Sequence, residues 1–385
     1  MSRLRILLAS LLLMLFVPCC CGQIGKSVII PAGSEIDHQL TAITKADPSQ
    51  KLALIDQFAS AHPEPEYQIV ADEQYIGYFL NAKQYDKVFE YGEKLFALDP
   101  DSYSTAVNMI RAAAEKGDID KMFAYGEKAN AIVQRFTNSS APAGMDAATW
   151  DATKQQKLAN SKDDQDYVRQ SLVSGAYGVA DPAKKASYFE LLGKLYANTP
   201  EGDQAFAMAV ASYQQAQDHS KMLEVANHAL TLNPNNISVL LLLADDCSEK
   251  PDQLDKAESY ANKVLSLTQT AKKPDGVPDD QWTQEISVQK GLALSTLGQV
   301  GIARKQNAQA VDSLTKAAPL LKSNPTSYAR NQYRLGFAYL NLKKNPEAKQ
   351  AFTDAASVDS PYKAPAQQKL TELNTPHPGV HKKPS

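Results

Sequence analysis

The sequence predicts an all-α protein, an α-solenoid in which antiparallel helix hairpins stack on one another. Two recurrences at one spacing support this prediction. Tyr91-Gly92-Glu93-Lys94 returns 34 residues later as Tyr125-Gly126-Glu127-Lys128, and Pro200 returns 34 residues later as Pro234. Apolar residues at i, i+3, i+4 and i+7 give each predicted helix one apolar stripe. Because one hairpin cannot bury that stripe alone, hairpins with this period are expected to stack.

The repeat nearest the C-terminus carries the strongest pattern, in the stretch RNQYRLGFAYLNLKKNPEAKQAFTDAASVDSP. Its first helix is expected to hold Leu335, Gly336 and Tyr339, and its second Ala348, Phe352 and Ala355, with Pro361 one place late. These positions resemble the tetratricopeptide repeat (TPR). The resemblance implies a right-handed superhelix in which Gly336 and Ala348 let two helix backbones approach, while Tyr339 and Phe352 fill the space between repeats.

Weaker copies of this unit divide the rest of the chain. An N-terminal TPR-like block is predicted at 35–202 and a C-terminal TPR block at 203–361. A polar capping helix follows at 362–374, with Leu370 and Leu373 turned inward, since a terminal repeat presents one face to water. The individual hairpins are expected at 35–65, 69–102, 103–136, 150–202, 203–236, 237–270 and 282–327.

The N-terminal 22 residues have the composition of an export signal. Arg3 and Arg5 precede the apolar run 6–17, which is shorter than the roughly 20 residues of a membrane-spanning helix. We therefore expect an exported protein of the bacterial periplasm or cell envelope, without a transmembrane segment in the mature chain. It is either cleaved near Gly22 or attached to the membrane by a lipid on Cys19, Cys20 or Cys21.

The segments flanking the repeats carry little apolar periodicity. Residues 23–34 are predicted to be a loose leader, and the proline-rich tail 375–385 is predicted to be disordered. Beyond the three cysteines near the signal, the chain holds only Cys247, so no internal disulfide is expected.

Composition and motifs indicate a protein that is not an enzyme. A formal net charge of −3 does not suggest a nucleic-acid partner. The sequence has no HExxH, no GxSxG and no phosphate-binding glycine loop, so neither a cofactor nor a metal site is expected. The pair His377 and His381 lies in the tail and is interpreted as functionless. Acidic pairs such as Asp245-Asp246 are interpreted as solvated helix faces.

The TPR resemblance implies that a ligand binds on the concave face, through positions 2, 5, 9, 12 and 13 of each first helix. The expected function is a non-enzymatic scaffold that holds a protein or peptide. Two alternatives stay open at this point: an exported glycan- or small-ligand-binding protein, and a regulatory arm of a separately encoded enzyme. Tyr333 and Phe337 equally fit plain packing on the capping helix. The predicted partner-binding residues are Arg111, Glu115, Gln214, Arg330, Tyr333, Phe337 and Asn341.

The two tryptophans occur in similar surroundings, Gly144-Met145-x4-Trp150 and Gly276-Val277-x4-Trp282, 132 residues apart. This spacing is typical of a hydrophobic staple, in which a residue just before a helix packs on its first turn. We therefore predict that each Trp is mostly buried at a helix start, with Asp146 as N-cap of the first. The recurrence also suggests that 69–202 and 203–327 descend from one duplicated array.

Overall fold

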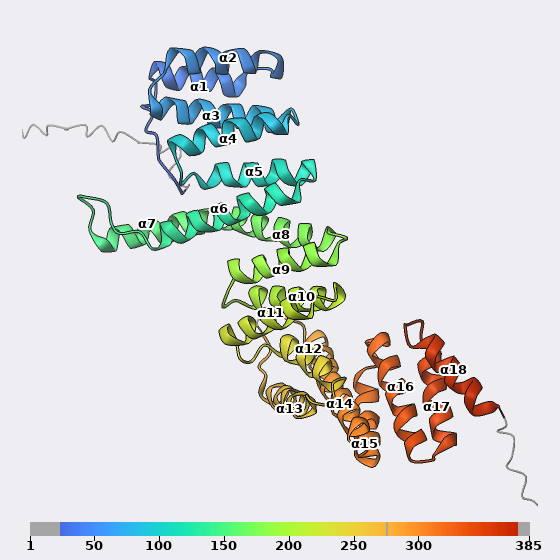
Figure 1. The fold of residues 1–385 in the computed structure, drawn as a ribbon. Coiled ribbons are helices and arrows are strands. Elements are labelled where there is room, and N and C mark those ends of the chain that lie inside the picture. Colours follow the sequence, from blue (N-terminus) through green and yellow to red (C-terminus); the bar gives the residue numbers. More distant parts are fainter. Residues whose placement is uncertain (1–23, 275, 376–385) are drawn as a thin grey trace, which may run out of the picture. The chain divides into compact units, whose positions relative to one another are not determined.

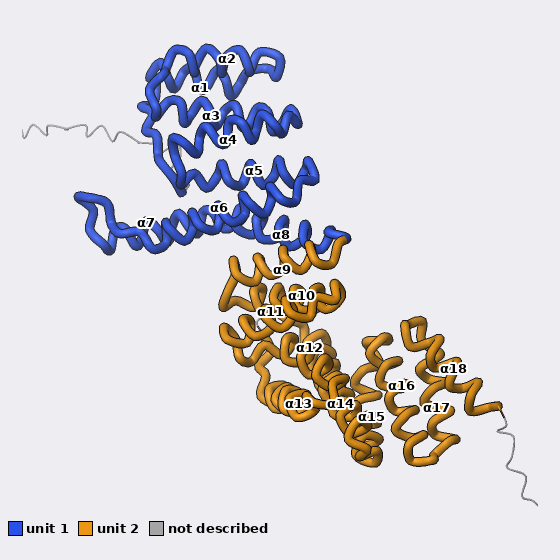
Figure 2. Tube along the Cα trace, viewed as in Figure 1, with its two compact units in different colours: residues 1–180 blue, residues 181–385 orange. Residues whose placement is uncertain are grey.

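The structure is a computed structural model that describes residues 24–274 and 276–375. The predicted export signal, Cys19 to Cys21 and the tail from residue 376 lie outside the described residues. The chain forms two compact units, residues 1–180 and 181–385 (Figure 2). The described part is helical and contains no strand, and none of its helices is both long and apolar enough to cross a bilayer.

Unit 1 is a stack of helices in which each of the first six packs against the next (Figure 1). The helix α8 then packs against both α5 and α6. The described helices of this unit are α1 (Glu35–Lys45), α2 (Pro48–Ala61), α3 (Pro65–Asn81), α4 (Tyr85–Leu98), α5 (Tyr103–Lys116), α6 (Ile119–Thr137), α7 (Ala147–Asn160) and α8 (Lys162–Gly178).

Unit 2 continues the same construction, and each helix packs against the next. The first helices of successive hairpins also meet, since α10 contacts α12, α12 contacts α14, and α14 contacts α16. Its described helices are α9 (Pro182–Leu195), α10 (Pro200–Gln215), α11 (His219–Leu232), α12 (Ile237–Ser248), α13 (Leu254–Thr270), α14 (Asp279–Ala303), α15 (Asn307–Leu320), α16 (Pro325–Asn341), α17 (Asn345–Ala356) and α18 (Lys363–Asn374).

The helices begin where the sequence supplies caps. A side-chain oxygen at the N-cap accepts a hydrogen bond from a backbone N–H of the first turn, which satisfies a donor that has no partner within the helix. Proline at the first helical position serves the same boundary, because its missing N–H is not needed there. Such side-chain caps are Ser34, Asp118, Asp146, Asp181, Thr199, Asp218, Asn236 and Asn324.

Five hairpins share one turn between their helices. The residue two places before each second helix adopts a left-handed backbone conformation, and it is glycine in only one of the five. In the last of them, Lys343 N–H donates to Leu340 O at 2.9 Å and Lys344 N–H to Tyr339 O at 3.0 Å, which closes the first helix. The five residues are Lys83 (φ 56°), Gly117 (73°), Gln217 (59°), Lys305 (63°) and Lys343 (61°).

The close helix contact predicted for the strongest repeat is confirmed. A Cβ placed on Gly336 of α16 would lie 2.6 Å from Cε1 of Phe352 on α17. Ala348 and Phe352 are fully buried, and Tyr339 packs beside them. The missing side chain at Gly336 therefore lets the Phe352 ring lie directly on the backbone of α16.

The predicted hairpin 150–202 is not a single hairpin in the structure. Its first half forms α7 and α8, which meet at Ser161 and belong to unit 1, whereas α9 belongs to unit 2. α9 packs on α10, where the Phe206 ring fills the space above Gly193. The compact units therefore divide at 180/181, whereas the repeat blocks were expected to divide at 202/203.

The leader is packed, in contrast to the loose segment predicted from its composition. The side chain of Ile24 is 2% exposed, and its carbonyl accepts a hydrogen bond from Tyr103 N–H at 3.1 Å. Lys26 donates from its backbone to Asp99 Oδ2 at 2.7 Å and from Nζ to Leu98 O at 2.7 Å. One buried isoleucine and these hydrogen bonds attach the leader to the turn between α4 and α5.

Both tryptophans lie in the first turn of a helix, as predicted, and both are partly buried. Asp146 caps α7 by accepting from Thr149 N–H at 2.9 Å. Trp150 packs edge-on against Phe136 of α6 and donates from Nε1 to Ser139 O at 3.1 Å. Met145 is exposed, so α6 supplies the packing that was predicted to come from the staple.

Candidate functional site

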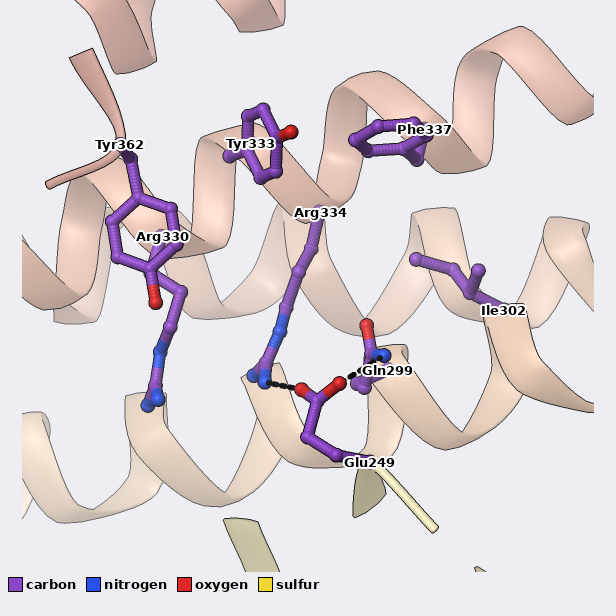
Figure 3. Close-up of a pocket in the computed structure, with 8 residues that line it drawn as sticks. All are labelled: Glu249, Gln299, Ile302, Arg330, Tyr333, Arg334, Phe337 and Tyr362. Atoms are coloured by element: carbon purple, nitrogen blue, oxygen red, sulfur yellow. Dashed lines mark hydrogen bonds and ion pairs between the residues drawn. The ribbon is translucent and has the colours of Figure 1, made fainter. Parts of the chain in front are cut away.

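Unit 2 contains a cavity of about 240 Å³ bounded by α12, α14, α16 and the start of α18 (Figure 3). Three of the predicted partner-binding residues line it together, namely Arg330, Tyr333 and Phe337. All three come from α16, where the repeat pattern placed them on the concave face. The other lining residues are Glu249, Gln299, Ile302, Arg334 and Tyr362.

Two arginines one helical turn apart on α16 reach back to α12. Arg330 Nη1 lies 2.6 Å from Asp245 Oδ2, and Arg334 Nη2 lies 3.1 Å from Asp245 Oδ1. Arg334 Nη2 also lies 2.8 Å from Glu249 Oε1, and the other oxygen of Glu249 accepts from Gln299 Nε2 at 3.3 Å. α12 and α16 each pack against α14, so these long side chains bridge two first helices that have a third between them in chain order.

The protein holds this cluster in its charged form. Burial by itself raises the pKa of a carboxyl group, but the charges of Arg330 and Arg334 outweigh it and lower the pKa of Asp245. Burial likewise opposes the charge on Arg330, and the Asp245 carboxylate outweighs it and raises the pKa of that guanidinium. Asp245 and the two arginines are therefore ionised at neutral pH.

One donor in the cluster is unused. The Arg334 side chain is only 7% exposed, and its Nη1 atom is buried without a hydrogen-bond acceptor among the described residues. A buried guanidinium nitrogen without an acceptor costs more than a neutral donor would. Arg330 and Arg334 extend side by side away from α16 in Figure 3, so this unused donor belongs to the lining of the cavity.

Aromatic rings form the opposite wall. Tyr333 meets Phe337 edge-on at 5.0 Å between ring centroids, and Tyr333 lies 5.7 Å from Tyr362. Both rings of α16 also pack against Phe352 and against the capping helix. The two readings of Tyr333 and Phe337 therefore hold together, because each ring packs on its neighbours with one part and lines the cavity with another.

The remaining predicted residues lie outside this cavity. Arg111 and Glu115 belong to unit 1, where Arg111 pairs with Asp164 at 3.1 Å and Glu115 accepts from the Tyr85 hydroxyl. Gln214 on α10 is exposed. Asn341 is also exposed and donates to Asn307 Oδ1 at 3.0 Å, at the turn end of its hairpin.

The sequence did not predict Arg334, Glu249 or Tyr362 as site residues. Arg334 falls on a helical position that the TPR resemblance assigns to packing, although its spacing of four from Arg330 indicates one shared helix face. The interpretation of Asp245-Asp246 as a solvated pair was wrong. Asp245 is 25% exposed and holds both arginines, and the partly buried Asp246 pairs with Lys250 at 2.7 Å.

Unit 1 has a second hollow, of about 330 Å³, between the leader, α1 and α3. Val70 and Glu73, two concave positions of the first full repeat, line it. Glu73 stays accessible to solvent, yet the surrounding protein, and after it the Asp99 carboxylate, raises its pKa to about 7. The neighbouring Asp72 is 6% exposed, and burial raises its pKa to about 6 against the opposing charge of Lys94. In the part of the chain that the structure describes, no three His, Cys, Asp or Glu side chains are grouped as a metal site requires.

Hairpins of 34-residue period, one recurrent turn and a glycine under the ring of the next helix are now together on the page. The fold is a TPR-like helical repeat. The right-handed superhelix implied by the resemblance concerns the chain as a whole and stays a prediction.

Comparison with known proteins adds little to this assignment. No protein-family model matches the chain, and no curated protein matches it. Solved structures that align with 88% of the chain include the P58(IPK) TPR domain (14% identical, 98% of that chain, TM-score 0.25) and the apo quorum sensor NprR from B. thuringiensis (13% identical, 78% of that chain, TM-score 0.31). Yeast Tom70 aligns similarly (13% identical, 94% of that chain, TM-score 0.21). These TM-scores are too low to carry an argument, so the fold rests on the hairpins themselves.

Proposed function

We propose that this protein is a non-enzymatic scaffold that holds a protein or peptide partner on its first-helix face. The observation that carries the proposal is the cavity on α12, α14 and α16, where arginine and aromatic side chains meet. Arginine, tyrosine and tryptophan are the residue types that most often dominate binding energy at protein interfaces. The repeat fold by itself is a limited argument for function, because one fold serves many functions.

The proposed location is the bacterial cell envelope. Its support is the sequence of the first 22 residues, with two arginines followed by a short apolar run and three cysteines. Metabolic labelling of the expressed protein with a palmitate analogue separates the two forms of export. Label that is lost when Cys19, Cys20 and Cys21 are replaced by serine indicates a lipid anchor, whereas an unlabelled protein recovered from the periplasm indicates cleavage.

The partner is best sought with a photo-crosslinking residue placed in the cavity. p-Benzoylphenylalanine at Phe337 keeps an aromatic ring at that position, and the same residue at Gln350, an exposed position on the second helix α17, serves as the matched control. We expect ultraviolet irradiation of cells to give a protein adduct at position 337 and a weaker one or none at 350. Equal adducts at both positions, or none at 337, would count against the cavity as a binding surface.

A further inference from the structure

The cavity of unit 2 contains two guanidinium groups and one partly buried carboxylate. Arg330 and Arg334 both pair with Asp245, whose side chain is 25% exposed. The second carboxylate, Glu249, is 58% exposed and contacts only Arg334 among the two arginines. Asp245 alone therefore leaves an excess of one positive charge, which a mostly solvated carboxylate neutralises.

The arginines also have more donors than these carboxylates use. A guanidinium has five N–H donors in a planar fork that suits a carboxylate held through two parallel hydrogen bonds. Arg334 directs both of its ion pairs from Nη2, while Nη1 has no acceptor among the described residues. A carboxylate in the cavity offers acceptors to this pair of arginines without requiring either helix to move apart.

The walls of the cavity limit what accompanies that carboxylate. Phe337 and Ile302 contribute apolar surface, and Tyr333 and Tyr362 close the side above Arg330 (Figure 3). A volume of about 240 Å³ lies below the range of about 300–1,000 Å³ common for small-molecule pockets. One acidic side chain with an apolar neighbour on a protein surface fits these limits better than a complete metabolite.

We propose that Arg330 and Arg334 form a binding site for an acidic side chain of a protein partner, which Asp245 and Glu249 partly occupy in the free protein. This inference rests on the proposed scaffold function and names the chemistry that its cavity recognises. Binding then competes with the internal carboxylates, so the free protein binds more weakly than the two arginines alone would. Removing the charge of an internal carboxylate strengthens binding, and removing an arginine weakens it.

The test uses 3-phenylpropionate as the probe, a carboxylate next to an aromatic ring, and neutral 3-phenylpropanamide as its control. Both are titrated into the full chain, and binding is followed by NMR shifts of the tyrosine and phenylalanine rings. The acid is expected to bind at least tenfold more tightly than the amide. Glu249→Gln, in a mostly exposed residue that does not threaten folding, is expected to strengthen binding of the acid several-fold.

Arg330→Met is expected to weaken binding of the acid at least tenfold. Arg304→Met is the matched control, because Arg304 also bridges two acids of unit 2, Asp255 and Glu258, but lies outside the cavity. Equal binding of acid and amide, or unchanged binding in Glu249→Gln, would overturn the proposal. A loss as large in Arg304→Met as in Arg330→Met would overturn it as well.

The two proposals fail separately. If the probe behaves as expected and the crosslinker at Phe337 captures no protein, the anion site stands and the protein partner falls. If a partner is captured and the probe does not distinguish acid from amide, the scaffold function stands and the acidic recognition falls.

Discussion

Arg334 on α16 and Asp245 on α12 form an ion pair of 3.1 Å between residues 89 apart in the chain. Both side chains are mostly buried, with 7% and 25% exposure. Removing one partner of such a pair leaves a charge with reduced solvation and without its counter-ion. The pair therefore contributes to the stability of unit 2 as well as to its cavity.

We predict that Arg334→Met lowers the free energy of unfolding of unit 2 by about 2 kcal/mol, because Asp245 keeps only Arg330 as a partner. Arg304→Met, whose partner Asp255 is 99% exposed, is expected to cost less than about 1 kcal/mol. Urea denaturation followed by circular dichroism measures both variants. Equal losses would mean that the burial of the Arg334 pair is without energetic effect.

Gly336→Ala is expected to destabilise unit 2 by about 2 kcal/mol, since the new methyl group meets the buried Phe352 ring at 2.6 Å. Gly77→Ala on α3 is the opposite case. A Cβ there has no neighbouring atom within 4 Å, so the better helix propensity of alanine is expected to stabilise unit 1 by up to about 1 kcal/mol. Thermal unfolding of the two variants should shift in opposite directions, and a shared direction would contradict the packing described for Gly336.

Lys343 has a left-handed backbone at φ 61°, which costs a non-glycine residue about 1–2 kcal/mol. Lys343→Gly removes that cost but makes the unfolded chain more flexible, so a net stabilisation of about 0.5–1 kcal/mol is expected. Lys349→Gly, in the interior of α17, is expected to destabilise by about 1 kcal/mol. A loss of stability in Lys343→Gly, measured by chemical denaturation, would be inconsistent with the left-handed turn.

Asp72 makes the stability of unit 1 depend on pH. Burial raises its pKa from an ordinary 3.8 to about 6, so the folded state retains a proton that the unfolded state releases between these values. Stability should therefore rise as the pH falls from about 7 toward 4, by up to about 3 kcal/mol from this residue. Glu73, whose pKa is raised to about 7, acts in the same direction but more weakly, because it is accessible to solvent.

Asp72→Asn removes the charge that burial penalises. We expect it to be more stable than the wild type at pH 7 and to show a flatter dependence of unfolding free energy on pH. Urea denaturation at pH 7, 6 and 5 provides the comparison. A variant that loses stability at pH 7 would indicate that the charged carboxylate is favourable where it lies.

The repeat period predicted the hairpins closely wherever the pattern was strong. The unit expected at 103–136 corresponds to α5 and α6, which span Tyr103–Lys116 and Ile119–Thr137. The segment 150–202 was predicted less well, because nothing in its composition specifies that α9 packs with α10 in unit 2. The leader was mispredicted for a similar reason, since one isoleucine and three hydrogen bonds to distant residues attach it.

The sequence by itself determined the elements and their order, since caps, turns and the spacing of small and apolar residues act within about one repeat. It also placed Arg330, Tyr333 and Phe337 on one helix face. Only the tertiary structure brought Asp245, Glu249 and Tyr362 to that face, because those contacts join residues separated by more than one repeat or by a turn whose direction has no local signal. Burial then decided which charges are paired, as it did for Arg334 and Asp245, since the cost of removing a charge from water depends on what surrounds it in the folded chain.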